Sequence, residues 1–134
     1  MRAVRWVVVS VVACSLLILL GCEETGKPLV ITDRDLGRIE QVKVRVGQVV
    51  YLRLNENPTT GYRWTLKWRP RHPLELTENK YQPSNPGMIG AGGIHRFTIK
   101  AVHPGQVTVT LQHGRPWHGG EREKPKTFKV MVLE

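Results

Sequence analysis

Hydrophobic residues recur at every second position in several short stretches, and this period-two pattern is the feature that most constrains the fold. Val42, Val44 and Val46 alternate with charged residues, and residues 50–54, 62–66, 97–99, 107–111 and 128–132 repeat the pattern. Such alternation places one face of an extended strand in a core and the other in solvent. Glycine and proline separate the stretches, and residues 22–134 show no helical period. We therefore expect an all-β, antiparallel β-sandwich.

The N-terminal residues are typical of an export signal. Arg2 and Arg5 precede an apolar run, residues 6–20, that is short for a membrane span. The following residues, Leu19-Leu20-Gly21-Cys22, resemble the lipobox of bacterial lipoproteins, which implies that Cys22 becomes the lipidated first residue of the mature chain. An uncleaved anchor and a signal peptide cleaved nearby are the alternatives.

This resemblance implies a signal peptide (residues 1–21), a lipidated N-terminus and tether (22–27) and a folded domain (28–134). The domain would be lipid-anchored in the bacterial cell envelope, on the periplasmic or outer-membrane side of a Gram-negative cell. The two cysteines of the chain, Cys14 and Cys22, both belong to the export segment. The folded domain therefore has neither an internal disulfide nor a thiol nucleophile.

The chain is basic, with a formal charge of +9, of which +7 remains when Arg2 and Arg5 are removed. A basic domain can bind nucleic acid, anionic lipid or an acidic protein. Export argues against nucleic acid. The Lys and Arg residues are distributed over many expected strands, so we expect most of them on solvated faces, with steering toward an acidic partner as an alternative.

Three long connections are expected at one end of the sandwich: residues 55–61, 83–93 and 113–124. The connections between them, residues 69–73 and 102–105, would lie at the other end, because successive antiparallel strands cross the domain in opposite directions. This placement assumes that residues 74–82 form one strand. Loops that cluster at one end of a sandwich are common binding sites.

The first of these connections contains Asn57-Pro58-Thr59-Thr60-Gly61-Tyr62. Pro58 fixes one backbone angle and Gly61 permits a positive φ, so the sequence predicts a shaped turn. Thr59 and Thr60 form a small, uncharged tip that is suited to entering a cleft. An ordinary hairpin turn is the alternative explanation of this composition.

The other two connections carry a glycine motif and an aromatic one. Gly90-Ala91-Gly92-Gly93 lies in an uncharged segment and would let the main chain approach a partner closely, although a flexible linker would have a similar sequence. In Arg115-Pro116-Trp117, the proline holds the tryptophan out of the strand pattern. Arg and Trp are frequent binding hot spots. The alternative has Trp117 folded against the sandwich edge with Arg115 stacked on it.

Together and in this order, the three motifs resemble the chagasin family of cysteine-protease inhibitors, whose loops read Asn-Pro-Thr-Thr-Gly-Tyr, Gly-x-Gly-Gly and Arg-Pro-Trp. The resemblance extends from about Leu29 to the C-terminus. It implies an immunoglobulin-like β-sandwich whose three loops form a wedge that reversibly blocks the active-site cleft of a papain-family protease. The protease-binding residues that it implies are Asn57, Pro58, Thr59, Thr60, Gly61, Gly90, Ala91, Gly92, Gly93, Arg115, Pro116 and Trp117.

Thr60 and Trp117 are expected to contribute most to binding, followed by Thr59, whereas Tyr62 and Trp64 are expected to support the fold. A monomer is sufficient for this mechanism. The loops contain no cysteine and no Ser–His–carboxylate set, and the five histidines are dispersed, so we expect no catalysis, no metal site and no cofactor. An envelope adhesion or assembly module that binds a non-protease partner would explain the fold and the anchor, but not the three motifs together.

Overall fold

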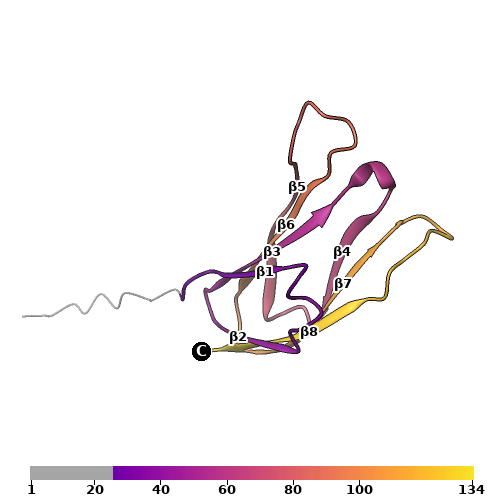
Figure 1. The fold of residues 1–134 in the computed structure, drawn as a ribbon. Coiled ribbons are helices and arrows are strands. Elements are labelled where there is room, and N and C mark those ends of the chain that lie inside the picture. The colour runs from indigo at the N-terminus through magenta and orange to yellow at the C-terminus, as the bar shows by residue number, and fades with distance from the viewer. Residues whose placement is uncertain (1–25) are drawn as a thin grey trace, which may run out of the picture.

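The computed structural model describes residues 26–134, which form a β-sandwich with one short 3₁₀ helix (Figure 1). The expected signal peptide and Cys22 lie outside the described residues. The elements are β1 (Leu29–Thr32), β2 (Gln41–Arg45), β3 (Val49–Glu56), η1 (Pro58–Thr60), β4 (Arg63–Arg69), β5 (Leu74–Pro83), β6 (Gly93–Ala101), β7 (Gly105–Gly114) and β8 (Lys126–Leu133).

The strands form two four-stranded sheets with the orders β1-β3-β6-β5 and β2-β8-β7-β4. The inner pairings are antiparallel, as the sequence predicts, but β1 pairs in parallel with β3, and β2 in parallel with β8. The sheets are therefore mixed. The reason is that β2 lies between β1 and β3 in the chain yet crosses to the opposite sheet, so that β1 and β3 run in the same direction.

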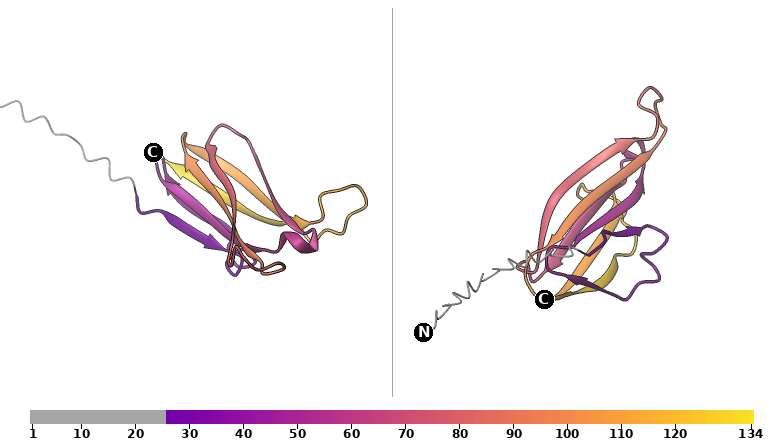
Figure 2. Two further views of the ribbon diagram at one scale, coloured as in Figure 1. Left: turned by 90° about the horizontal axis from the view of Figure 1, so that it is seen from above. Right: turned by 90° about the vertical axis from the view of Figure 1, so that its left-hand side faces the viewer.

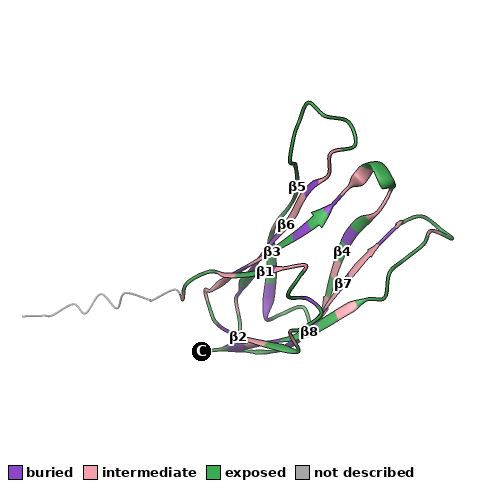
Figure 3. Ribbon diagram, viewed as in Figure 1, coloured by how far each residue is buried: buried purple, intermediate pink, exposed green. Residues whose placement is uncertain are grey.

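The core lies between the two sheets and consists of the inward residues of the alternating pattern (Figure 3). Leu52, Leu54 and Leu111 are fully buried, and burial of such a side chain contributes about 1.5–3 kcal/mol. Leu36, in the connection between β1 and β2, is an additional core residue that the period-two pattern did not predict. Val46 was expected to point inward, but it follows the last residue of β2 and is exposed.

Three connections project from the same end of the sandwich, in agreement with the prediction (Figures 1 and 2). We call them the first loop (residues 57–62), the second loop (84–92) and the third loop (115–125). The assumption behind that prediction is confirmed, because β5 runs as one strand from Leu74 to Pro83. The start of the described chain and the C-terminus lie at the opposite end (Figure 2). Within residues 26–134, no helix has the length and apolarity that crossing a membrane requires.

Candidate functional site

The first loop is a compact turn held by its own hydrogen bonds. Asn57 caps η1, because its Oδ1 accepts hydrogen bonds from the Thr59 backbone N–H at 3.2 Å and from the Thr59 hydroxyl. The Thr60 hydroxyl donates to the carbonyl of Asn57 at 2.7 Å, and the Gly61 N–H donates to the carbonyl of Pro58 at 3.0 Å. Gly61 has φ +81°, the left-handed region that favours glycine. These bonds leave Thr59 and Thr60 exposed at the tip.

A side-chain hydrogen bond ties the second loop to the first. The Asn57 Nδ2 donates to the carbonyl of Gly90 at 3.1 Å, and Gly92 lies against the backbone of Glu56 and Asn57. Gly93 is packed at the base of the second loop. It is the buried first residue of β6, and a Cβ there would collide with the backbone of Gln82 and Pro83. We therefore leave Gly93 out of the protease-contact surface proposed below.

The third loop contacts the first through Arg115 and Trp117. The Arg115 Nε donates to the carbonyl of Thr60 at 3.2 Å, and its guanidinium lies 5.0 Å from the Tyr62 ring centroid and 5.9 Å from that of Trp117. The Trp117 ring lies against Gly61, where a Cβ would be only 2.5 Å from its Cη2 atom. Trp117 nevertheless stays 53% exposed. It is thus braced by the first loop and still presents much of its ring to solvent.

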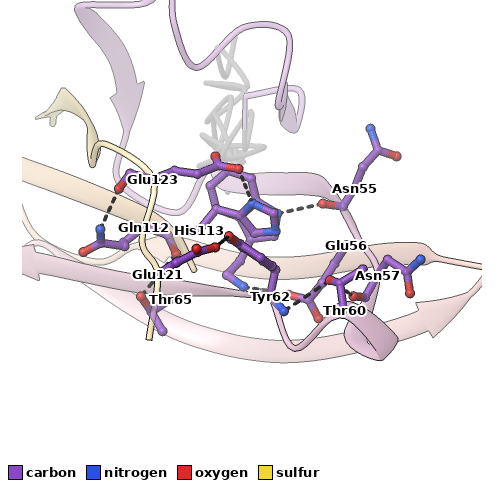
Figure 4. Close-up of polar contacts among 11 residues, drawn as sticks. Asn55, Glu56, Asn57, Thr60, Tyr62, Thr65, Gln112, His113, Glu121 and Glu123 are labelled. Atoms are coloured by element: carbon purple, nitrogen blue, oxygen red, sulfur yellow. Dashed lines mark hydrogen bonds and ion pairs between the residues drawn. The ribbon is translucent and has the colours of Figure 1, made fainter. Parts of the chain in front are cut away.

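A second set of contacts at this end involves Tyr62 and the acidic residues of the third loop (Figure 4). The Tyr62 hydroxyl donates to Glu121 Oε2 at 2.7 Å, and this hydrogen bond raises the pKa of Tyr62. Glu121 Oε2 also lies 3.5 Å from Arg115 Nη1. Tyr62 therefore links the end of the first loop to the third loop.

Glu56 is a supporting residue that the sequence did not reveal. Its buried carboxylate accepts a hydrogen bond from the Trp64 backbone N–H at 2.7 Å and lies 3.0 Å from His95 Nδ1. The Trp64 indole N–H donates to the carbonyl of Asn55 at 2.8 Å (Figure 4). These contacts clamp together the two strand ends that bound the first loop. The only indication in the sequence was that an acidic residue directly precedes Asn57. That position alone does not predict that the carboxylate is buried.

Two exposed apolar residues of the second loop were also not among the expected contacts. Ile89 is 99% exposed and Met88 is 61% exposed. Burying such side chains against a partner is favourable, and together with Trp117 they give the loop end an apolar character. The signal available in the sequence was the Met-Ile pair inside an otherwise glycine- and proline-rich segment.

His113, Glu121 and Glu123, near the loops, have structural partners. His113 stacks on Trp64 with ring centroids 4.6 Å apart, and its Nδ1 lies 3.0 Å from Glu123 Oε1. In the part of the chain that the structure describes, no group of three or more His, Cys, Asp or Glu residues has an arrangement suited to a metal ion. The site is therefore a set of mutually braced loops with small hydroxyl, glycine and apolar side chains at its tips.

Comparison with known proteins shows which family has these three loops. A family model described as chagasin family peptidase inhibitor matches residues 43–132, which include all three loops. The chain belongs to the chagasin family. It is accordingly a cysteine-protease inhibitor and not an enzyme.

Known proteins match most of the domain. Chagasin from Trypanosoma cruzi is 34% identical over 87 residues, covering 62% of this chain and 79% of chagasin. Amoebiasin-1 from Entamoeba histolytica is 27% identical over 93 residues, covering 68% of this chain and 88% of the relative. The crystal structure of a cysteine protease inhibitor from Entamoeba histolytica superimposes with a TM-score of 0.69 at 23% identity, covering 80% of this chain and 96% of that one. The immunoglobulin-like sandwich is confirmed by this likeness.

Proposed function

We propose that this chagasin-family member inserts its loop end into the active-site cleft of a papain-family cysteine protease, with the Thr59–Thr60 tip over the catalytic cysteine. The observation that carries the proposal is the bracing of the three loops against one another. Asn57 bonds to Gly90, Arg115 bonds to Thr60, and the Trp117 ring lies on Gly61. Loops held in this way lose little conformational entropy on binding.

The shape of the first loop explains why the inhibitor would not be cleaved. A papain-type cleft holds its thiolate–imidazolium pair along a groove that accepts an extended peptide. The first loop is a 3₁₀ turn closed by hydrogen bonds from Thr60 and Gly61 to Asn57 and Pro58, so its backbone does not run through the groove as a substrate would. Thr59 and Thr60 are small enough to approach the thiol.

The second and third loops would contact the walls of the cleft. Ile89, Met88 and Trp117 offer exposed apolar surface for burial, and the glycine-rich main chain of residues 90–92 can approach a partner closely. The proposed contact surface comprises Pro58, Thr59, Thr60, Gly61, Met88, Ile89, Gly90, Ala91, Gly92, Pro116 and Trp117, with Asn57 and Arg115 holding the loops in place.

We also propose that the domain is anchored to an envelope membrane through a lipid on Cys22. Gln48 Nε2 donates to the carbonyl of Lys27 at 2.8 Å, which fixes the start of the described chain at the end opposite the loops. Three residues, 23–25, lie between Cys22 and Gly26, and the four Cα-to-Cα steps span at most about 14 Å. An anchor at Cys22 would therefore leave the three loops facing away from the membrane. Incorporation of a labelled fatty acid into the full chain, and its loss in Cys22→Ser, would test the anchor.

The function is tested by titrating residues 23–134, which contain the whole buried core, against papain of known active-site concentration. We expect stoichiometric, reversible inhibition with the inhibitor left intact. The double variant Thr60→Ala/Trp117→Ala should lose inhibition while its thermal unfolding midpoint stays near that of the parent, because both side chains are exposed. Val30→Ala/Leu76→Ala, at exposed positions of β1 and β5 in the other sheet, is a control that should inhibit normally. Full inhibition by the loop variant would contradict the proposal.

A further inference from the structure

The outward positions of the strands β2, β8, β7 and β4 carry several cationic side chains and no acidic ones; at the far end, Arg45 Nη1 donates to the main-chain oxygen of Glu134 at 3.4 Å. The inward residues of these strands, such as Val44, Val109 and Val130, fill the core, so the alternate residues point to solvent. Among these outward positions in the four strands, none is Asp or Glu. The outward cations, which we call the basic face, are Lys43, Arg45, Arg63, Lys67, Arg69 and Lys129, and all six are exposed.

The register of the sheet spreads these charges over a wide area. Thr108 lies between Arg69 and Lys129, since it pairs with both, and Thr110 pairs with Lys67. No two cations stand directly opposite each other in these pairings, which limits their mutual repulsion. Within residues 26–134, none of the six forms an ion pair with a carboxylate side chain. A dispersed field of this kind suits an extended anionic surface better than a small anion, which needs converging donors.

The other sheet shows that this asymmetry does not simply follow from a basic composition. On its outward face, Arg96 forms two hydrogen bonds to Glu78, at 3.0 and 2.9 Å. Lys100 stands opposite Glu75 in the register of β6 and β5. Arg53, Arg96 and Lys80 form a row of cations across that face, but Glu75 and Glu78 stand beside them, so that face has a mixed charge.

The basic face is continuous with the loop end. A surface hollow lies where this face meets the loop end. It is lined by Arg63 and Lys67 together with Arg115 and Arg122 of the third loop, and no carboxylate side chain lines it. Gly114 joins the two regions, because it pairs with Arg63 on β4 and forms a bridge with Arg122. A protease that accepted the loops in its cleft would therefore bring the surface beside that cleft toward these cations.

We propose that the basic face steers the inhibitor toward an acidic surface flanking the active-site cleft of the target protease and so accelerates the association of the two proteins. The proposal rests on the inhibitory function proposed above and adds the chemistry of the preferred target. Charges outside the tightly packed contact act mainly on the association rate, and they do so at a range set by ionic strength. The same charges would give no such gain with a protease that is basic around its cleft.

The test compares two triple variants with equal changes in net charge. Lys43→Gln/Lys67→Gln/Lys129→Gln removes half of the basic face, and Arg53→Gln/Lys80→Gln/Lys100→Gln removes three exposed cations from the other sheet. Association rate constants are measured by stopped flow with residues 23–134 and a papain-family protease of acidic isoelectric point. At low ionic strength we expect the first variant to associate about tenfold more slowly than the parent and the second to change little. The differences in association rate between each variant and the parent should shrink as salt is added. The dissociation rates of the variants should stay equal to that of the parent.

Equal slowing by the two triple variants would overturn the proposal, because it would reveal an effect of net charge alone. Unchanged rates for both would overturn it as well. A third opposing result is that the first variant loses binding to phosphatidylglycerol vesicles but keeps its association rate with the protease, which would assign the face to a membrane surface. Absence of inhibition by the parent protein is distinguishable from these results, since it would refute the proposed function itself.

Discussion

Substituting Gly61 with alanine should separate inhibition from folding. Gly61 has φ +81°, and its ideal Cβ would lie 2.5 Å from Trp117 Cη2 and 3.1 Å from Trp117 Cζ3. A left-handed conformation costs a non-glycine residue about 1–2 kcal/mol. The Trp117 ring is at the end of a half-exposed side chain, so it can swing away at little cost to the free energy of unfolding. We expect that free energy to fall by only the strain, which lowers the midpoint of thermal unfolding by about 5–10 °C.

Inhibition should suffer more than stability. Displacement of a hot-spot tryptophan typically costs at least about 2 kcal/mol of binding free energy. This loss alone corresponds to an inhibition constant that is at least about 30-fold higher, because the strain is present in both the free and the bound inhibitor and cancels from the binding free energy. The assay is the inhibition constant for papain, measured beside calorimetric unfolding of the same preparation.

Gly47 provides a matched control, because it has φ +89° in the turn before β3, at the end opposite the loops. Gly47→Ala should lose a similar amount of stability and inhibit normally. In a Trp117→Ala background, Gly61→Ala should lower the free energy of unfolding by the cost of strain and leave the inhibition constant unchanged, since no ring is left to displace. The reasoning would be refuted if Gly61→Ala inhibited as well as the parent, or if Gly47→Ala weakened inhibition to the same degree.

Two further predictions concern the supports of the sandwich. Glu56→Gln should lower the free energy of unfolding by about 1–3 kcal/mol and weaken inhibition, because the buried carboxylate that holds the Trp64 N–H and His95 is replaced. Urea denaturation would measure the stability and papain titration the inhibition. Unchanged values would show that Glu56 does not support the first loop. The hydrogen bonds of Arg96 hold the pKa of Glu78 below its ordinary range, so this carboxylate stabilises the fold at neutral pH, and its contribution should disappear as the pH falls through that lowered pKa. Glu78→Gln should therefore flatten the acid limb of the stability profile in urea titrations, and an unaltered profile would contradict this assignment.

The sequence by itself determined most of the fold class and the composition of the loop end. Period-two alternation is a local property, because each residue of a strand points opposite to its neighbour whatever the strand pairs with. The turn at Asn57 and Gly61 is likewise encoded locally, by an Asn cap, a proline at the first helical position and a glycine with positive φ. Counting strand crossings was enough to place the three loops at one end.

Only the tertiary structure decided which strands share a sheet, and several features of the site depend on that choice. The parallel pairs at the sheet edges and the burial of Glu56 against His95 join residues that are far apart in the chain. Gly93 became part of the packing between β5 and β6, although its motif indicated a contact residue. The basic face also exists only because β2, β8, β7 and β4 are neighbours. Alternation tells which residues of one strand share a side, whereas pairing between distant strands, driven by burial of the common core, decides which sides form one surface.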